Sequence, residues 1–266
     1  MSYENLIFET KGNVAYISLN RPQALNSLNG ELFNELEAVF DYLYDDRNIL
    51  GVIITGEGRA FCAGTDITEI LEVPVGKSEN APERIGDHLV DVHRVFNKIE
   101  NYERPVIAAI NGLALGGGCE LAMCCDIRIL SSKAAFGQPE VALGVIACYG
   151  GTQRLPKIVG PGIAKEIMFT GRTVKAEEAK QLGWANQVVE PEELLNAAQA
   201  MMDVILAKAP IAVKYTKNCI NKGQEVSLAY GLEYEKDKAS LCMATKDLQN
   251  GIQAFLEKRA AVFQNK

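Results

Sequence analysis

The sequence predicts an α/β fold in which strands and helices alternate over the first two-thirds of the chain and helices fill the last third. Short apolar runs beside glycine-rich turns, such as residues 51–55 and 106–110, are typical of buried strands. Apolar residues recur at helical spacing between these runs and over most of the chain after residue 161. A strand–strand–helix unit recurs loosely, which favours a coiled stack of such units.

The N-terminal part predicts a hairpin followed by a helix. Residues 6–10 and 14–19 alternate around a short turn, as the two strands of a hairpin do. Residues 29–44 have helical spacing, with Asn29 placed as the N-cap and apolar positions at Leu32, Leu36, Val39, Phe40 and Leu43.

The middle of the chain is interrupted by a polar stretch. Residues 72–86 are rich in charged and helix-breaking residues, which predicts a mobile loop. A helix over 87–99 leads to the strand at 106–110, and a glycine-rich turn then leads to a short helix over 120–124. Residues 126–130 predict another strand.

The last third predicts helices, apart from one short strand near 187–189. The helical patterns cover 161–170, 176–182, 191–208, 210–222 and 226–258. Apolar faces on the late helices, which carry Leu232, Leu241 and Phe255, predict docking onto a neighbouring subunit, the alternative being that they cover the core. We therefore expect a core over 1–195 and a helical oligomerisation region over 196–266.

The composition is that of an ordinary globular protein rather than a nucleic-acid-binding or membrane protein, and it fits a cytoplasmic enzyme. Hydrophobic residues make up 48% of the chain and the net charge is −7, whereas binding to nucleic acid usually needs a basic face. No apolar run of about 20 residues and no signal-peptide pattern is present. The seven scattered cysteines form no C-x-x-C pair, which indicates that their thiols are kept reduced and predicts a cytoplasmic location.

The most informative segment is the glycine triplet Gly116 to Gly118, with Glu120 close behind it. Glycines there allow close approach of a ligand and leave the first amides of the helix free to stabilise negative charge on a carbonyl oxygen. A carboxylate beside such amides suits proton chemistry next to a carbonyl. Tight packing and compensation of the helix dipole by Glu120 remain alternatives. A phosphate loop is excluded because no Lys-Ser/Thr follows the glycines.

Two further segments carry candidate chemistry. Residues 58–67 form a strand-exit turn with free amides expected near Ala63 and Gly64. Residues 135–140 end in Glu140, which alone could be a loop or cap residue, and a second glycine-rich turn follows them at 148–154.

Together these segments resemble the crotonase family, the enoyl-CoA hydratase/isomerase superfamily, and most closely its short-chain enoyl-CoA hydratases. The resemblance runs almost from end to end and includes residues 20–26, 59–66, 105–120, 136–140, 150–154 and 254–259. It implies a crotonase-like spiral of repeated ββα units with a C-terminal helical trimerisation region. It also implies a homotrimer or a homohexamer built from two trimers.

The resemblance assigns roles to the candidate site residues. The backbone amides of Ala63 and Gly117 would hold the thioester oxygen of an acyl-CoA in an oxyanion hole. Glu120 and Glu140 would together hold a water: Glu120 helps to deprotonate it for attack at Cβ, and Glu140 supplies the proton to Cα. This reaction needs no metal and no cofactor, since coenzyme A is part of the substrate.

The resemblance also implies where coenzyme A binds, and one departure from the family concerns the acyl group. The substrate-binding positions are Ala24, Leu25, Ala63, Gly64, Thr65, Asp66, Ile67, Gly117, Phe255 and Lys258. The last two would reach the nucleotide end of CoA in a neighbouring subunit, although Lys258 could also be a solvated helix end. Many hydratases of the family have Pro-Gly where this chain has Ala147 and Cys148, so we expect a remodelled acyl pocket there.

Several other hypotheses remain open at this point. The same family could support an isomerase, a hydrolase or a decarboxylase, because a fold does not fix a function. A scaffold or RNA-binding role would require a basic stripe, which the sequence lacks. A nucleophilic Cys148 is disfavoured because no activating base is visible, and His88 and His93 are interpreted as structural or solvated.

Overall fold

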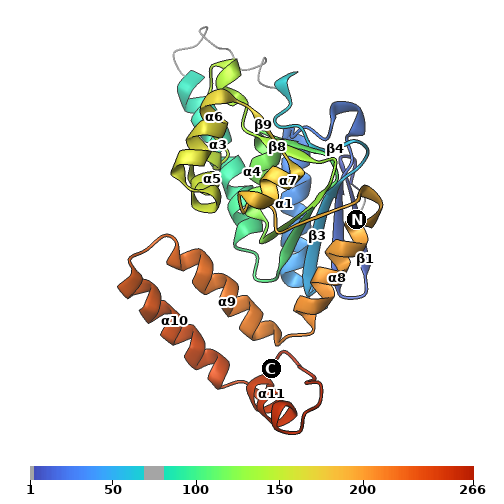
Figure 1. The fold of residues 1–266 in the computed structure, drawn as a ribbon, viewed down its shortest axis with the longest axis vertical. Helices are drawn as coiled ribbons and strands as arrows, with labels where there is room; N and C mark the ends of the chain where they lie inside the picture. Colours follow the sequence, from blue (N-terminus) through green and yellow to red (C-terminus); the bar gives the residue numbers. More distant parts are fainter. Residues whose placement is uncertain (1–2, 69–80) are drawn as a thin grey trace.

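Two β-sheets form the centre of the computed structural model, which describes residues 3–68 and 81–266 (Figure 1). One sheet has six strands, in the order β1 (Leu6–Lys11), β2 (Val14–Leu19), β3 (Gly51–Gly56), β5 (Val106–Ile110), β7 (Ile127–Ser131) and β10 (Gln187–Val189). The other has four strands, in the order β4 (Ala60–Cys62), β6 (Leu113–Leu115), β8 (Ala135–Gly137) and β9 (Thr173–Lys175).

The chain alternates between these sheets and so forms a spiral. Strands β3, β5 and β7 are parallel neighbours in the larger sheet. The strand after each of them, β4, β6 or β8, joins the smaller sheet, where these three are again parallel neighbours. Repeated strand–strand–helix turns therefore stack along the molecule, which confirms the predicted fold class.

Helices cover the sheets and extend beyond them. Three short 3-10 helices also occur: η1 (Pro22–Ala24), η2 (Glu140–Leu143) and η3 (Pro191–Glu193). The α-helices are α1 (Gly30–Asp45), α3 (Ala81–Glu100), α4 (Gly117–Cys124), α5 (Gly151–Val159), α6 (Pro161–Thr170), α7 (Ala176–Gln181), α8 (Leu194–Leu206), α9 (Pro210–Gly223), α10 (Leu228–Met243) and α11 (Lys246–Leu256). Figure 1 shows α9, α10 and α11 extending away from the sheets.

The alternation of side chains along the larger sheet produces two apolar cores. On one face, Val52, Ile54 and neighbouring residues pack with the buried side of α1, α3 and α4. On the opposite face, Ile53 and Ile107 contact α8 through Leu194, Ala198 and Met202. No helix in the described ranges has the length and apolar character to cross a membrane.

Several predicted elements are confirmed. The hairpin pairs Leu6 with Leu19, and α1 begins after Asn29, whose side chain accepts a hydrogen bond from the Leu32 amide at 3.0 Å. The strands at 51–55, 106–110 and 187–189 are also present.

Other elements differ from the sequence-based predictions. Strands β4, β6, β8 and β9 and helix α5 were not expected. The helical pattern predicted over 226–258 forms two helices, α10 and α11. They are separate because Thr245 is the N-cap of α11, where its side chain accepts a hydrogen bond from the Leu248 amide. The mobile loop predicted over 72–86 is wrong for residues 81–86, because α3 already begins at Ala81. Residues 72–80 lie outside the part of the chain that the structure describes.

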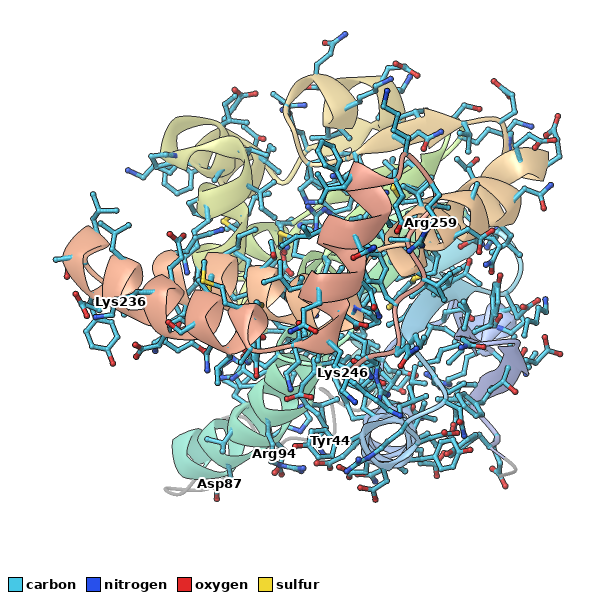
Figure 2. All side chains as sticks on the ribbon, turned by 90° about the horizontal axis from the view of Figure 1, so that it is seen from below. Tyr44, Asp87, Arg94, Lys236, Lys246 and Arg259 are labelled. Atoms are coloured by element: carbon cyan, nitrogen blue, oxygen red, sulfur yellow. The ribbon has the colours of Figure 1, made fainter. Side chains whose placement is uncertain are left out.

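The late helices expose apolar side chains, as the sequence indicated. Leu232 is 53% exposed, Leu241 49% and Phe255 82%. Figure 2 shows charged side chains, such as Lys236 on α10, on the outer surface of the same region. Docking of this region onto a neighbouring subunit stays a prediction.

Candidate active site

Glu120 lies at the start of α4 and is almost completely buried, with 1% of its surface exposed. Its Oε1 accepts hydrogen bonds from the backbone amides of Tyr149 at 2.8 Å and Gly151 at 2.7 Å. Both donors lie in the glycine-rich turn at which α5 begins. Because Oε1 takes both amides, Oε2 is the oxygen through which this carboxylate can act on a bound molecule.

The glycine triplet is required by packing as well as by conformation. Gly116 precedes α4 and has a φ of +50°, a backbone conformation that would be strained in a residue with a side chain. A Cβ on Gly118 would lie 2.1 Å from the carbonyl oxygen of Cys62, so α4 approaches β4 at a distance that only glycine allows. Tight packing and an amide-lined site therefore coexist in one segment.

Glu140 reaches the same place from η2. Its Oε1 lies 2.9 Å from the position that a Cβ on Gly116 would occupy. The buried amide of Gln138, oriented so that both groups are satisfied, donates to the two oxygens of Glu140 at 2.9 and 3.1 Å. The structure thus brings both predicted carboxylates to the N-terminus of α4.

The two carboxylates affect each other's protonation. Burial raises the pKa of Glu120 to about 7, and the charge of Glu140 adds to this rise, while hydrogen bonds from Gly151 and Tyr149 and the charge of Arg154 oppose it. Burial also raises the pKa of Glu140 above its ordinary value. Near neutral pH Glu120 is therefore present in both its protonated and its ionised form, which suits acid and base catalysis.

The two predicted oxyanion-hole amides lie on adjacent turns. A Cβ on Gly64, whose φ is +110°, would lie 3.1 Å from the Leu115 carbonyl oxygen and 3.8 Å from the Gly117 nitrogen. Gly117 is the first residue of α4, so its amide has no acceptor within the helix. The Ala63 amide, however, donates to the Leu25 carbonyl at 3.0 Å and is not free in this structure.

The expected CoA-binding turn is braced by an arginine that the sequence analysis did not assign. Arg21 donates to Asp66 at 2.9 Å and to the Ser27 carbonyl at 2.5 Å. The Leu28 amide donates to the Gly64 carbonyl at 2.8 Å. These bonds hold the turn that contains Gly64 and Asp66 against the segment around η1, which carries the predicted positions Ala24 and Leu25, while Thr65 and Ile67 follow in the same turn.

The predicted acyl-pocket residues also lie beside the carboxylates. Ala147 is buried, and its Cβ lies 3.1 Å from the position of a Cβ on Gly151. Burial, together with the charges of Glu120 and Glu140, raises the pKa of the half-buried Cys148 thiol to about 11. Cys148 is therefore a neutral thiol at neutral pH, as expected for a wall residue rather than a nucleophile.

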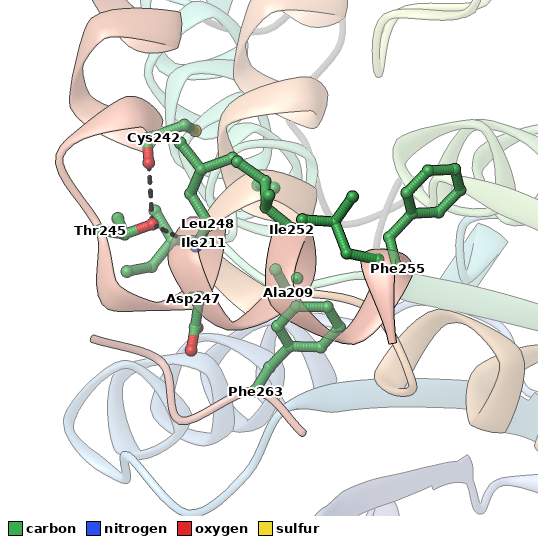
Figure 3. A pocket seen from close by; sticks show the side chains of 12 residues that line it. Ala209, Ile211, Cys242, Thr245, Asp247, Leu248, Ile252, Phe255 and Phe263 are labelled. Atoms are coloured by element: carbon green, nitrogen blue, oxygen red, sulfur yellow. Dashed lines mark hydrogen bonds between the residues drawn. The ribbon is translucent and has the colours of Figure 1, made fainter. Parts of the chain in front are cut away.

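The two remaining predicted CoA-binding positions, Phe255 and Lys258, lie far along the chain from this site. Phe255 on α11 lines a cavity of about 350 Å³ with residues of α9, α10 and the C-terminal tail (Figure 3). Lys258 follows α11 with a φ of +53°. Both belong to the helical region that extends from the sheets in Figure 1.

No group of three or more His, Cys, Asp or Glu side chains that could hold a metal ion occurs in residues 3–68 and 81–266.

Two site residues were missed by sequence reasoning, Gln138 and Arg21. Both lie within the motifs that were recognised, which was the available signal. Their hydrogen-bond partners, Glu140 for Gln138 and Asp66 for Arg21, could not be inferred from the spacing of residues along the sequence.

Comparison with known proteins shows the family to which this chain is related. Residues 9–266 match the family model described as enoyl-CoA hydratase/isomerase. The short-chain-enoyl-CoA hydratase of Clostridium acetobutylicum is 44% identical over 97% of each chain, and the crotonyl-CoA hydratase of Syntrophomonas wolfei is 43% identical over the full length of both. A crystal structure of an enoyl-CoA hydratase from Bacillus anthracis superposes with a TM-score of 0.91 at 38% identity, covering 99% of this chain and 100% of that one.

Proposed function

The chain belongs to the enoyl-CoA hydratase/isomerase family, and we propose that it is an enoyl-CoA hydratase, a hydro-lyase acting on short-chain 2-enoyl-CoA thioesters. The reaction adds water reversibly across the 2,3 double bond and gives a 3-hydroxyacyl-CoA. One observation carries the proposal: two carboxylates, the buried Glu120 and the partly buried Glu140, meet beside the N-terminus of α4.

The two carboxylates divide the proton chemistry. Glu120 is partly ionised near neutral pH, because its pKa is about 7, and its Oε2 takes a proton from water as the oxygen attacks C3. Glu140, whose pKa burial raises above its ordinary value, is proposed to be the acid that gives a proton to C2. Since the reaction needs only a base, an acid and a site for the enolate oxygen, we propose that it uses no metal and no separate cofactor.

The thioester oxygen is proposed to bind between the amides of Gly117 and Ala63. For this, the Ala63 amide must exchange the Leu25 carbonyl for the substrate oxygen. The exchange is favoured as negative charge develops on that oxygen, and a single donor of this kind typically contributes about 2.7–4 kcal/mol to transition-state stabilisation.

The remainder of the substrate is proposed to lie along the turn from Gly64 to Ile67, beside Ala24 and Leu25, with the acyl group against Ala147 and Cys148. Phe255 and Lys258 would bind the nucleotide end of CoA in a neighbouring subunit of a trimer or of a hexamer of two trimers. The exposed apolar faces of α10 and α11 support such an assembly. A cytoplasmic location and a role in fatty acid metabolism would fit this activity.

The test is to replace each carboxylate by its isosteric amide. We expect Glu120→Gln and Glu140→Gln each to lower kcat for hydration of crotonyl-CoA by about 10²- to 10⁴-fold, with folding intact. Loss of the conjugated double bond is followed by absorbance, and the exposed Glu235→Gln variant is the control. Wild-type rates in both site variants would refute the assignment.

A further inference from the structure

The turn that binds Glu120 is itself held by one arginine. Tyr149 and Gly151, whose amides bind Glu120, flank Gly150 at the beginning of α5. Arg154 donates from Nη1 to the Tyr149 carbonyl at 3.1 Å. Gly150 has a φ of +106°, and a Cβ there would lie 1.9 Å from Arg154 Nη1, so the guanidinium can pack against the turn only if this residue is glycine.

The other side of the Arg154 guanidinium is fixed to α3. Nε and Nη2 donate to the Glu100 carboxylate at distances of 2.7 to 3.2 Å, and Nη2 also donates to Asn97 Oδ1 at 3.0 Å. On the same helix, His93 donates from Nε2 to the Cys148 carbonyl at 2.7 Å. Positions 93, 97 and 100 have the spacing of one helix face. Helix α3 therefore holds the turn at two points.

We propose that Arg154 is a positioning residue for Glu120: by tying the Tyr149–Gly151 turn to Glu100 on α3, it fixes the two amides that orient the carboxylate. Among the described residues its hydrogen bonds go to Tyr149, Glu100 and Asn97 and not to Glu120, so it acts through the turn. The proposal rests on the proposed function, because it takes Glu120 to be the catalytic base.

Charge gives Arg154 a second, separable effect. Its guanidinium lowers the pKa of Glu120, while the Glu140 carboxylate raises it. Three thiols also interact with Glu120, those of Cys119, Cys124 and Cys148, and they stay neutral at neutral pH because burial raises the pKa of each. Removing the charge of Arg154 therefore raises the pKa of Glu120 further, whereas a lysine in its place preserves the charge but not the planar fork that Glu100 binds.

The experiment compares Arg154→Met with Arg154→Lys and Glu100→Gln. Arg172→Met is the matched control, because the side chain of Arg172 makes ion pairs with Glu166 and Glu178 and not with the turn that binds Glu120. We expect Arg154→Met to lower kcat for crotonyl-CoA by about tenfold to a hundredfold, with KM changed less than about threefold. The acid limb of its kcat–pH profile should move to higher pH by roughly half a unit to one unit.

Arg154→Lys should lose part of kcat without moving the acid limb, and Arg172→Met should match the wild type. If Arg154→Met does not fold, Glu100→Gln decides: a several-fold lower kcat supports the proposal and a wild-type kcat overturns it. Wild-type kcat and an unmoved acid limb in a folded Arg154→Met variant would also overturn it.

The titration of Glu120 can be followed without substrate. It is read by carbon-13 NMR of labelled glutamate, as the signal that disappears in Glu120→Gln. A raised pKa in Arg154→Met supports the charge effect of Arg154 and an unchanged pKa overturns that effect, whereas the kcat of Arg154→Lys and Glu100→Gln decides the positioning role. If the wild type hydrates no enoyl-CoA, the proposed function fails, while this titration still reports on the role of Arg154.

Discussion

Glu120 is a carboxylate whose burial has a consequence for stability as well as for catalysis. Its pKa is about 7 in the folded chain, well above the value of an exposed glutamate. A group with a raised folded-state pKa favours the folded state fully below its unfolded pKa. That contribution is lost as the pH rises through the folded pKa. Wild-type stability should therefore carry a penalty between about pH 5 and 8 that originates in this side chain.

Glu120→Gln removes the titration and should remove this penalty. We expect the variant to become more stable relative to the wild type as the pH rises from 5 to 8, by up to roughly 3 kcal/mol. Urea unfolding at several pH values measures the difference, with Glu235→Gln as an exposed control. A difference between variant and wild type that is constant with pH would contradict a raised pKa for Glu120.

At the scale of elements, the site depends on how closely α4 approaches β4. Gly118 sits at the contact, and a Cβ there would lie 2.1 Å from the Cys62 carbonyl oxygen and 2.7 Å from the Cys62 Cβ. Backbone atoms cannot move aside as a flexible side chain can. Any side chain at position 118 must therefore separate the helix from the strand, and with them Glu120 from the turn that contains Gly64.

Gly118→Ala should accordingly lower both stability and activity. We expect a loss of about 1–3 kcal/mol in the free energy of unfolding, the usual cost of overpacking a core, together with reduced hydration. Gly162→Ala in α6 is the control, because a Cβ there meets no atom within 4 Å and should be neutral or slightly stabilising. Equal stabilities of the two variants would show that this contact does not limit the packing.

The same elements show what the sequence could and could not predict. The longer strands β3 and β5 and helix α1 were predictable because their apolar patterns span several residues. Strands β4, β6, β8 and β9 have three residues each, which is too short for alternation, and they exist because neighbouring turns of the spiral pair them.

The candidate site was likewise predictable only where local sequence motifs carry the information. Glu120 and Glu140 could be assigned because each lies within a recognised motif. The pairs Arg21–Asp66 and Arg154–Glu100 join residues 45 and 54 positions apart. No local periodicity relates such partners, so only the folded arrangement shows them. The bond from the Ala63 amide to Leu25 was unforeseen for the same reason.

At the scale of the whole molecule, the projecting helices α9, α10 and α11 lead to a prediction about shared sites. If Phe255 serves the site of a neighbouring subunit, Phe255→Ala should raise KM for the CoA thioester while Glu120 remains functional. Unfolding and refolding Phe255→Ala together with Glu120→Gln should then recover activity, because mixed assemblies contain sites with both an intact Glu120 and a neighbour's Phe255.

The expected recovery is a fraction of wild-type activity at wild-type KM, accompanied by a solution mass of three or six times that of one chain. Each variant refolded alone is the control. Activity that is only the sum of the two separate variants, or a monomeric mass, would contradict the shared site.

The central claim is that this chain adds water across an enoyl-CoA double bond through Glu120 and Glu140. The most direct measurement is mass spectrometry of the product formed from crotonyl-CoA in water labelled with oxygen-18 and deuterium. We predict one solvent oxygen at C3 and one solvent hydrogen at C2, with the label lost when either glutamate is replaced by glutamine. Deuterium uptake without oxygen uptake, or release of free CoA in place of a hydrated thioester, would contradict the account.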